Sequence, residues 1–299
     1  MRYVHIMQLA ADTPWAILPA KLAAIQQFLA TKAAGDDIDP ADIRAFTEAA
    51  AARANPRAPG AVAVIPVVGT IVQRANIMTD MSGGVSTELF GKRMRQLVDD
   101  PNVKAIVMDV DSPGGMTSGV AELADSIHAM RGRKPIVAVS NTLMASAAYY
   151  IASQADEVIA SPSSETGSIG VFGLHQDVSA MAEMLGVRTT LISAGKFKTE
   201  GNPFEPLGEE ARQAMQTRVD AAYDLFVKAV ARGRGVSVSA VRGGYGEGRV
   251  LDAKAALAAG MVDRIATLDE TIARFGGSPM PQGSHAEVEH WKARAALAR

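Results

Sequence analysis

Short apolar segments alternate along this chain with longer segments in which apolar residues recur at every third or fourth position. The short segments, such as VKAIVMDV and PIVAV, are rich in valine and isoleucine, which is typical of buried strands. The longer ones, such as GVAELADSIHAMR, place their apolar residues on one face of a helix. The predicted strands are residues 61–72 (interrupted by Pro66), 103–110, 135–139, 157–160 and 187–193, and the predicted helices between them are 87–100, 119–131 and 144–154. This alternation predicts an α/β fold with a largely parallel sheet.

The C-terminal half continues with one long helix and a short closing unit. Residues 209–231 carry an apolar stripe at helical spacing, which we interpret as a packing face. Residues 251–266 are predicted to form a helix, a glycine stop and a short strand. We expect three parts: a helix-prone N-terminal segment (1–56), a main domain (57–275) and a flexible C-terminal tail (276–299).

Composition and charge exclude several classes of site. The chain has no cysteine, which rules out disulfides, thiolate nucleophiles and cysteine-bound zinc. Its formal net charge of -2 provides no general attraction for nucleic acid or anionic lipid. Residues 135–155 are uncharged and long enough to span a bilayer, but Ser140, Asn141 and Thr142 interrupt them, so a buried strand and helix fit better. We expect no nucleic-acid partner, no membrane span and a cytoplasmic location.

The sequence DSPGG directly follows the predicted strand that ends at Val110. In parallel α/β sheets, ligands bind beyond the carboxyl ends of the strands. Paired glycines such as Gly114 and Gly115 let backbone N–H groups approach a substrate oxygen without interference from a side chain. An ordinary turn between a strand and a helix is the alternative interpretation.

Ser146 lies among small residues at the start of the predicted helix 144–154. The positive end of the helix dipole lies near such a hydroxyl, and the N–H of Ala147 points to where an oxyanion could be held. The alternative is a serine that only caps the helix.

Two lysines in the sequence SAGKFKTEG complete the candidate chemistry. A lysine acts as a general base only where its surroundings lower its pKa, so the alternative for Lys196 and Lys198 is a solvated loop. Histidine offers no better base, because the histidines of the chain show no triad-like placement. The chain also lacks the HExxH motif of zinc metalloproteases.

Taken together, these segments resemble the signal-peptide-peptidase (protease IV) family of serine peptidases, and within it the lambda-type phage capsid-assembly (prohead) proteases. The matching sequences are IPVVGTIV, DVDSPGGMTSG, NTLMASAAYYIAS, TGSIGVFG, SAGKFKTEGNPFEPL and VLDAKAALAAGMVDRI. The resemblance implies a Clp-protease/crotonase-like fold, a Ser–Lys dyad and a homo-oligomer.

By position in these motifs, the resemblance makes Ser146 the nucleophile and Lys198, rather than Lys196, the base. It assigns Ser168 to holding the lysine amine, and the N–H groups of Gly115 and Ala147 to the oxyanion hole. It implies peptide hydrolysis through an acyl-enzyme, with no metal and no cofactor.

The resemblance also suggests a biological role. We expect a phage or prophage capsid-maturation protease that cleaves scaffold or portal protein in the host cytoplasm or prohead. The alternatives are a soluble bacterial signal-peptide-peptidase-like protease, a crotonase-type acyl-CoA enzyme and an inactive assembly protein.

Overall fold

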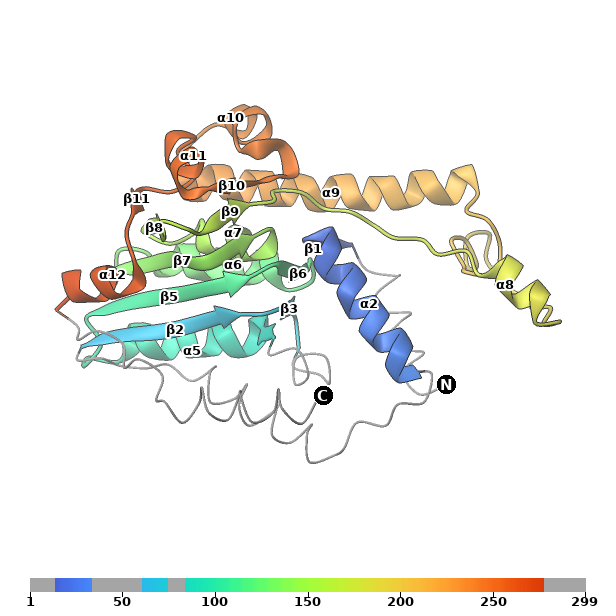
Figure 1. The fold of residues 1–299 in the computed structure, drawn as a ribbon, viewed down its shortest axis with the longest axis horizontal. Coiled ribbons are helices and arrows are strands. Elements are labelled where there is room, and N and C mark those ends of the chain that lie inside the picture. Colours follow the sequence, from blue (N-terminus) through green and yellow to red (C-terminus); the bar gives the residue numbers. More distant parts are fainter. Residues whose placement is uncertain (1–13, 34–60, 75–83, 277–299) are drawn as a thin grey trace, which may run out of the picture.

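The computed structural model describes residues 14–33, 61–74 and 84–276 of the chain. A mixed α/β body forms most of this part, and an extended arm leaves the body on one side (Figure 1). The predicted α/β fold class with a largely parallel sheet is confirmed.

Within the described residues, the larger sheet has seven strands, and β7 (Ile136–Ala145) lies at its centre. On one side of β7 come β5 (Ala105–Ser112) and then β2 (Val62–Val68), both parallel to it. On the other side, the first half of β7 pairs with β8, and the last residues of β7 pair with β9. The remaining bounds are β8 (Glu157–Ala160), β9 (Glu165–Gly167), β10 (Val250–Asp252) and β11 (Arg264–Ile265). Among the described strands of this sheet, only β10 is antiparallel to its neighbour, β9.

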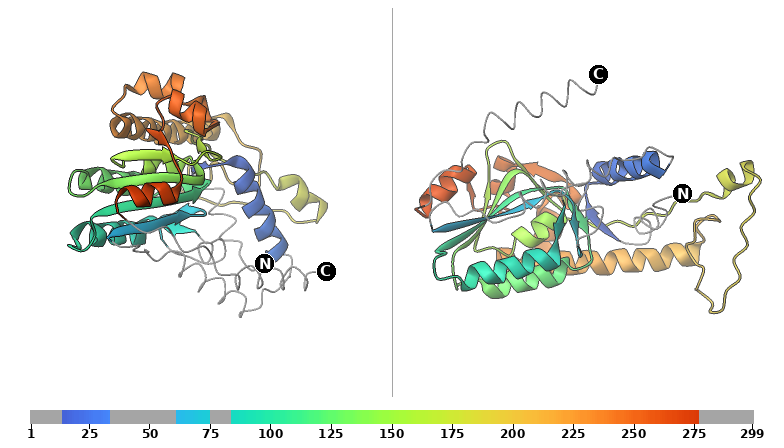
Figure 2. Two further views of the ribbon diagram at one scale, coloured as in Figure 1. Left: turned by 60° about the vertical axis from the view of Figure 1, so that its left-hand side comes forward. Right: turned by 90° about the horizontal axis from the view of Figure 1, so that it is seen from below.

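Helices cover both faces of this sheet, as the alternation of strand side chains requires. One face carries Val62, Val64, Val107, Val137 and Val139, which pack under α12 (Leu268–Arg274). The opposite face packs against α5, α6, α7 and α9 (Figure 2). The bounds of these and the remaining helices are α5 (Thr87–Asp99), α6 (Val120–Met130), α7 (Ala147–Ala152), α9 (Glu209–Arg234), α10 (Val238–Gly244), η1 (Gly246–Gly248) and α11 (Ala253–Ala258).

A smaller sheet lies beyond the carboxyl end of β5. Its strand order in the described residues is β1 (Trp15–Ile17), β6 (Gly114–Met116), β3 (Ile71–Val72) and β4 (Val85–Ser86). The first strand is antiparallel to β6 and leads into helix α2 (Pro19–Ala33). The N-terminal segment thus contributes a strand here in addition to the helix expected from its composition.

Two predicted elements differ from the structure. Residues 187–193 form no strand, because they lie exposed on the arm and pair with no other strand. Residues 61–72 form β2 and β3, but the break falls at Gly69, with φ 79°, rather than at Pro66. Pro66 lies within β2, which ends the larger sheet on that side. The predicted long helix is confirmed as α9, and the closing helix and strand are confirmed as α11 and β11, whereas the short strand β10 before α11 was not predicted.

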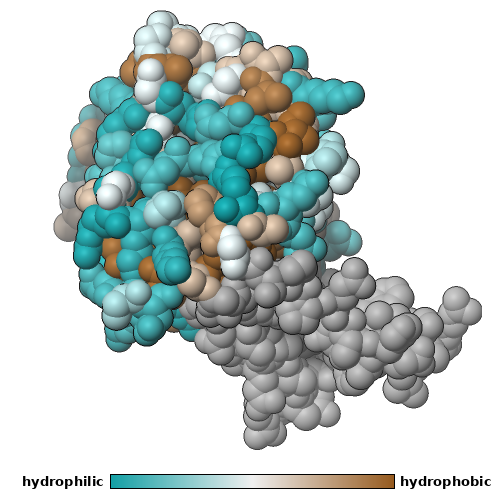
Figure 3. Space-filling view, turned by 90° about the vertical axis from the view of Figure 1, so that its left-hand side faces the viewer, coloured by the Kyte–Doolittle hydropathy of each residue, from teal (hydrophilic) through white to brown (hydrophobic). Residues whose placement is uncertain are grey.

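The arm consists of residues 173–210 and includes helix α8 (Ser179–Met184). It extends well away from the body beside the N-terminal half of α9 (Figure 1). Its exposed apolar residues are Met181, Met184, Leu185, Val187, Leu191, Ile192, Phe197 and Phe204. The opposite end of the molecule is mainly hydrophilic, with smaller apolar patches between the polar residues (Figure 3). No helix in the described residues is long and apolar enough to cross a membrane.

Candidate active site

Ser146 lies at the junction between β7 and α7 in an unusual backbone conformation. Its φ is 56° and its ψ is −119°, and its side chain forms no capping bond with the helix. The Ser146 N–H donates to the Gly167 carbonyl at 2.7 Å, and its Oγ donates to the Gly170 carbonyl at 3.4 Å. The simple helix-cap interpretation therefore does not describe this serine. A non-glycine residue in such a conformation is strained and is often found at functional sites.

The two glycines of β6 face Ser146 closely. Gly114 has φ 98°, and a Cβ added to it would lie 2.9 Å from Ser146 Cβ. A Cβ added to Gly115 would lie only 1.9 Å from the Ile71 carbonyl oxygen. Below them, Ser112 Oγ donates to the Gly69 carbonyl at 2.6 Å and accepts from the Gly114 N–H at 3.2 Å. Any side chain at these glycines would separate strands that must meet beside the serine.

Ser168 and Ala147 belong to the same site. Ala145 of β7 pairs with Gly167 of β9, which brings Ser168 close to the segment of Ser146. Ser168 also has a positive φ of 53°, and its N–H donates to the Arg249 carbonyl at 2.7 Å. Ala147 is the first residue of α7 and is fully buried. The structure therefore gathers Ser146, Gly115, Ala147 and Ser168 in one place.

Lys198 is placed elsewhere. It lies on the arm, and its side chain is exposed. Its neighbour Lys196 forms an ion pair at 2.8 Å with Glu210 in the first turn of α9. Farther along the same helix, Phe226 stacks on Tyr150 with 4.6 Å between ring centroids. The helical stretch from Glu210 to Phe226 is about 24 Å long, so within one chain the loop of Lys198 is remote from Ser146.

The buried tyrosines that follow Ser146 are not suited to act as a base. Burial raises the pKa of Tyr150 to about 12 and raises that of Tyr149 well above its usual value. Both hydroxyls therefore stay protonated at neutral pH, and that of Tyr149 donates to the Met261 carbonyl at 2.8 Å. His128 lies in the last turn of α6, and His175 lies on the arm within 3.0 Å of the Asn202 carbonyl. The described histidines thus belong to other parts of the molecule.

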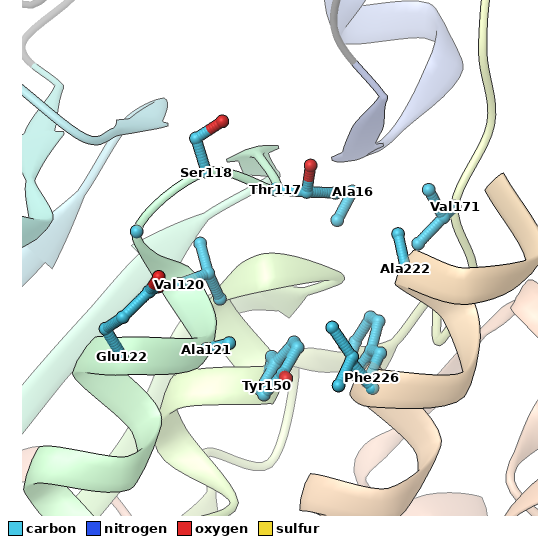
Figure 4. A pocket seen from close by; sticks show the side chains of 12 residues that line it. Ala16, Thr117, Ser118, Val120, Ala121, Glu122, Tyr150, Val171, Ala222 and Phe226 are labelled. Carbon is cyan, nitrogen blue, oxygen red and sulfur yellow. The ribbon is translucent and has the colours of Figure 1, made fainter. Parts of the chain in front are cut away.

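A pocket of about 180 Å³ opens between β1, the start of α6, α7 and α9, and Ser146 itself does not line it. Its wall includes Val171, which follows Gly170, and Tyr150, one turn beyond Ser146. Phe226 and Leu225 of α9 complete the apolar side, and the start of α6 forms the rim. Figure 4 shows Ala16 across this space from Tyr150 and Phe226. The shape and lining suit an apolar side chain.

The sequence alone did not identify three parts of this site. Gly170 lies two residues after Ser168 in a quoted motif, but its contact with Ser146 depends on how the chain turns after β9. The pocket joins residues from α6, α7 and α9, which no local pattern relates. The third part, Ala16, lies in a strand of three residues, which is too short for a periodic signal.

Comparison with known proteins gives a consistent result. Residues 128–276 match peptidase family S49. The chain is 34% identical over 248 residues to the capsid assembly protease C of Escherichia phage lambda, covering 83% of this chain and 54% of that protein. It is 36% identical over 229 residues to the head-tail preconnector protein of Enterobacteria phage P21, covering 74% and 45%. A putative signal peptide peptidase of Enterococcus faecium is 32% identical over 184 residues, covering 61% and 53%. The chain thus spans about half the length of these curated relatives.

Proposed function

Residues 128–276 belong to peptidase family S49, and from this premise we propose that the chain hydrolyses peptide bonds with Ser146 as the nucleophile. One observation carries the proposal: Ser146 is held in a strained backbone conformation at the start of a buried helix, directly against the glycines of β6. Strain of this kind persists where the surrounding structure enforces it, and it commonly serves to present a reactive group.

In the proposed mechanism, Ser146 Oγ attacks the substrate carbonyl carbon and its proton passes to the amine of Lys198. The N–H groups of Gly115 and Ala147 stabilise the oxyanion that forms. As the C–N bond breaks, the lysine returns the proton to the leaving amine, and an ester of Ser146 remains. The neutral lysine then takes a proton from water as the water oxygen attacks the ester carbon, and it returns that proton to Ser146 Oγ as the C–Oγ bond breaks, which releases the acid and restores both groups. Ser168 is assigned to orienting the amine.

We further propose that Lys198 reaches Ser146 of a neighbouring copy in a homo-oligomer. The exposed lysine and the length of α9 between its loop and Tyr150 support this arrangement. So does the apolar surface of the arm, where Ile192 is 96% exposed and Met184 is 83% exposed. Exposed apolar surface of this extent is typical of interaction sites.

The proposed substrates are polypeptides of a phage head, such as scaffold or portal protein, and the proposed location is the host cytoplasm or the prohead. The lambda and P21 relatives, which match most of this chain, support this role. The Enterococcus faecium relative makes a signal-peptide-peptidase-like activity a second candidate. We rank this candidate second because that relative matches a smaller part of the chain than the two phage proteins do.

Purified protein distinguishes these possibilities. A fluorophosphonate probe should label the wild-type chain at Ser146 and leave Ser146→Ala unlabelled, with Ser163→Ala, at an exposed position, as the control. Co-expression with the scaffold and portal proteins of its phage should give defined fragments only when Ser146 is present. Labelling without such fragments would favour the second candidate. A chain that is folded but never labelled would favour the inactive assembly protein or, if it binds coenzyme A, the acyl-CoA enzyme.

A further inference from the structure

Strand β1 lies beside the candidate nucleophile, between β6 and the segment that follows Ser168. On one side it is antiparallel to β6, with Ala16 opposite Gly115. On the other side, the Trp15 N–H donates to the Phe172 carbonyl at 2.8 Å, and the Phe172 N–H donates back at 3.0 Å. A three-residue strand therefore fills the gap between the two chain segments nearest to Ser146.

The register of β1 directs one of its carbonyls at the proposed oxyanion donor. The Leu18 N–H donates to the Pro113 carbonyl at 3.0 Å, and the Thr117 N–H donates to the Pro14 carbonyl at 3.3 Å. Hydrogen-bonded pairs alternate along an antiparallel ladder, so Ala16 and Gly115 form the hydrogen-bonded pair between these two. At such a pair, the Gly115 N–H and the Ala16 carbonyl face each other.

The same carbonyl also lies close to the serine. A Cβ added to Gly114 would lie 2.2 Å from the Ala16 carbonyl oxygen and 2.9 Å from Ser146 Cβ. The carbonyl and the seryl side chain therefore approach one point in space. A substrate carbonyl has to take this place if Gly115 is to stabilise its oxyanion.

The side chains of β1 are divided between two sides, as expected for a strand. Ala16 lines the apolar pocket beside Tyr150 and Phe226 (Figure 4). Trp15 and Ile17 point the other way and pack with Leu22, Val72 and Met116 under α2. A methyl group thus stands at the mouth of a pocket that has room for a larger apolar side chain, while the neighbouring side chains anchor the strand.

We propose that residues 14–18 occupy the groove in which the acyl side of a peptide substrate binds, and that this segment is a built-in pseudosubstrate that blocks the peptidase until it is displaced. This inference rests on the proposed function, because it takes Ser146 and Gly115 as catalytic groups. The ligand class of the groove is an extended peptide with an apolar side chain directed into the pocket.

Two substitutions of Ala16 should change the accessibility of Ser146 in opposite directions. Ala16→Asp places a carboxylate against the apolar pocket, which should release β1 and raise the rate of fluorophosphonate labelling at least about tenfold. Ala16→Leu adds apolar contacts in the pocket, which should slow labelling by roughly tenfold. Ala20→Asp, an exposed change in α2, should label like wild type.

Equal labelling rates for folded wild type and both Ala16 variants would overturn the proposal. If Ala16→Asp does not fold, Ala16→Leu still decides, and unchanged or faster labelling of that variant counts against the proposal.

A binding experiment separates this inference from the catalytic one. A fluorescent peptide of residues 12–20 should bind the double variant Ser146→Ala, Ala16→Asp, whose groove is open, and bind wild type at least about tenfold more weakly. The same peptide with aspartate at the position of Ala16 should not bind. Binding to the double variant without any labelling of Ser146 in the Ala16→Asp single variant, whose groove is also open, would refute the nucleophile and keep the groove. Equal binding to wild type and the double variant would refute the blocked groove and leave the peptidase proposal intact.

Discussion

The Ser146 N–H donates to the Gly167 carbonyl at 2.7 Å, so the segment of Ser146 and strand β9 are joined at the point where both leave regular structure. Both Ser146 and Ser168, which flank this bond in space, have positive φ angles of 56° and 53°. Positive φ is unfavourable for residues with a Cβ, and here two such residues are adjacent. The backbone conformation of these two serines therefore lowers the stability of the fold, and the proposed function gives a reason for keeping it.

The first prediction concerns this strain. Ser146→Gly and Ser146→Ala both remove the hydroxyl, but glycine alone accepts φ 56° and ψ −119° without cost. We expect the glycine variant to have a free energy of unfolding about 1 kcal/mol above that of the alanine variant. Urea denaturation followed by circular dichroism measures the difference. If the two variants unfold at the same urea concentration, the serine is not strained.

Mixing of two inactive variants tests whether the dyad forms between copies. Ser146→Ala lacks the nucleophile and Lys198→Ala lacks the base, so each alone should be inactive. If each site takes its lysine from a neighbour, random mixing in one oligomer restores about a quarter of the wild-type activity. The control is a mixture of Ser146→Ala with a Ser146→Ala, Lys198→Ala double variant, which should stay inactive. Complete inactivity of the first mixture, despite confirmed co-assembly, would place the base within the same chain as the serine.

Gly233 provides a stability prediction at the crossing of α7 and α9. A Cβ added there would lie 2.1 Å from the Ser153 carbonyl oxygen and 2.9 Å from Gln154 Nε2. Gly233→Ala must push the two helices apart and should lower the free energy of unfolding by about 2 kcal/mol. Gly243→Ala in α10 is the matched control, since nothing lies near its added methyl, and it should be neutral or slightly stabilising. Similar thermal midpoints for the two variants would contradict the close contact.

Glu157 should make stability depend on pH. Its carboxylate accepts from Arg274 Nη1 at 2.9 Å and pairs with Arg264 at 3.1 Å. The hydrogen bond from Arg274 holds the pKa of Glu157 below its usual value of 4.5. Its contribution is therefore complete above that pH and is lost as the pH falls and the carboxylate is protonated.

We expect Glu157→Gln to be less stable than wild type by about 1 kcal/mol at pH 7, with the difference vanishing near pH 3. Glu183→Gln, at an exposed position of α8, should match wild type at both values. Urea titrations at the two pH values measure the effect. A difference that persists unchanged at pH 3 would show that packing, and not charge, stabilises this contact between β8 and α12.

Local patterns predicted the central strands and helices because each of these elements buries a face with its own period. They placed the DSPGG segment beyond the carboxyl end of a parallel strand, but only the family resemblance implied that Gly115 and Ser146 share a site. The prediction of a strand from local pattern was wrong for residues 187–193. Their β-branched residues favour a strand only where another strand is available for pairing, and the arm offers none.

The position of Lys198 and the role of Ala16 lay beyond sequence reasoning for different reasons. The arm's direction follows from α9, a helix that is long enough to leave the body, and no residue near Lys198 encodes that geometry. Strand β1 is held by backbone hydrogen bonds to β6 and Phe172 and by the packing of Trp15 and Ile17, and both depend on where distant segments of the chain lie. Motifs thus supplied the candidate groups, while tertiary structure determines which of them meet within one chain.

Pro66 in β2 bears on how copies of the chain can associate. The strand ends the larger sheet in the described residues, and proline has no N–H to offer a further strand. Continuous pairing of β2 with a strand from another molecule is therefore disfavoured at this position, as is the growth of sheet-based aggregates from it. An ordered assembly of this chain is therefore expected to form through surfaces other than this edge of the larger sheet.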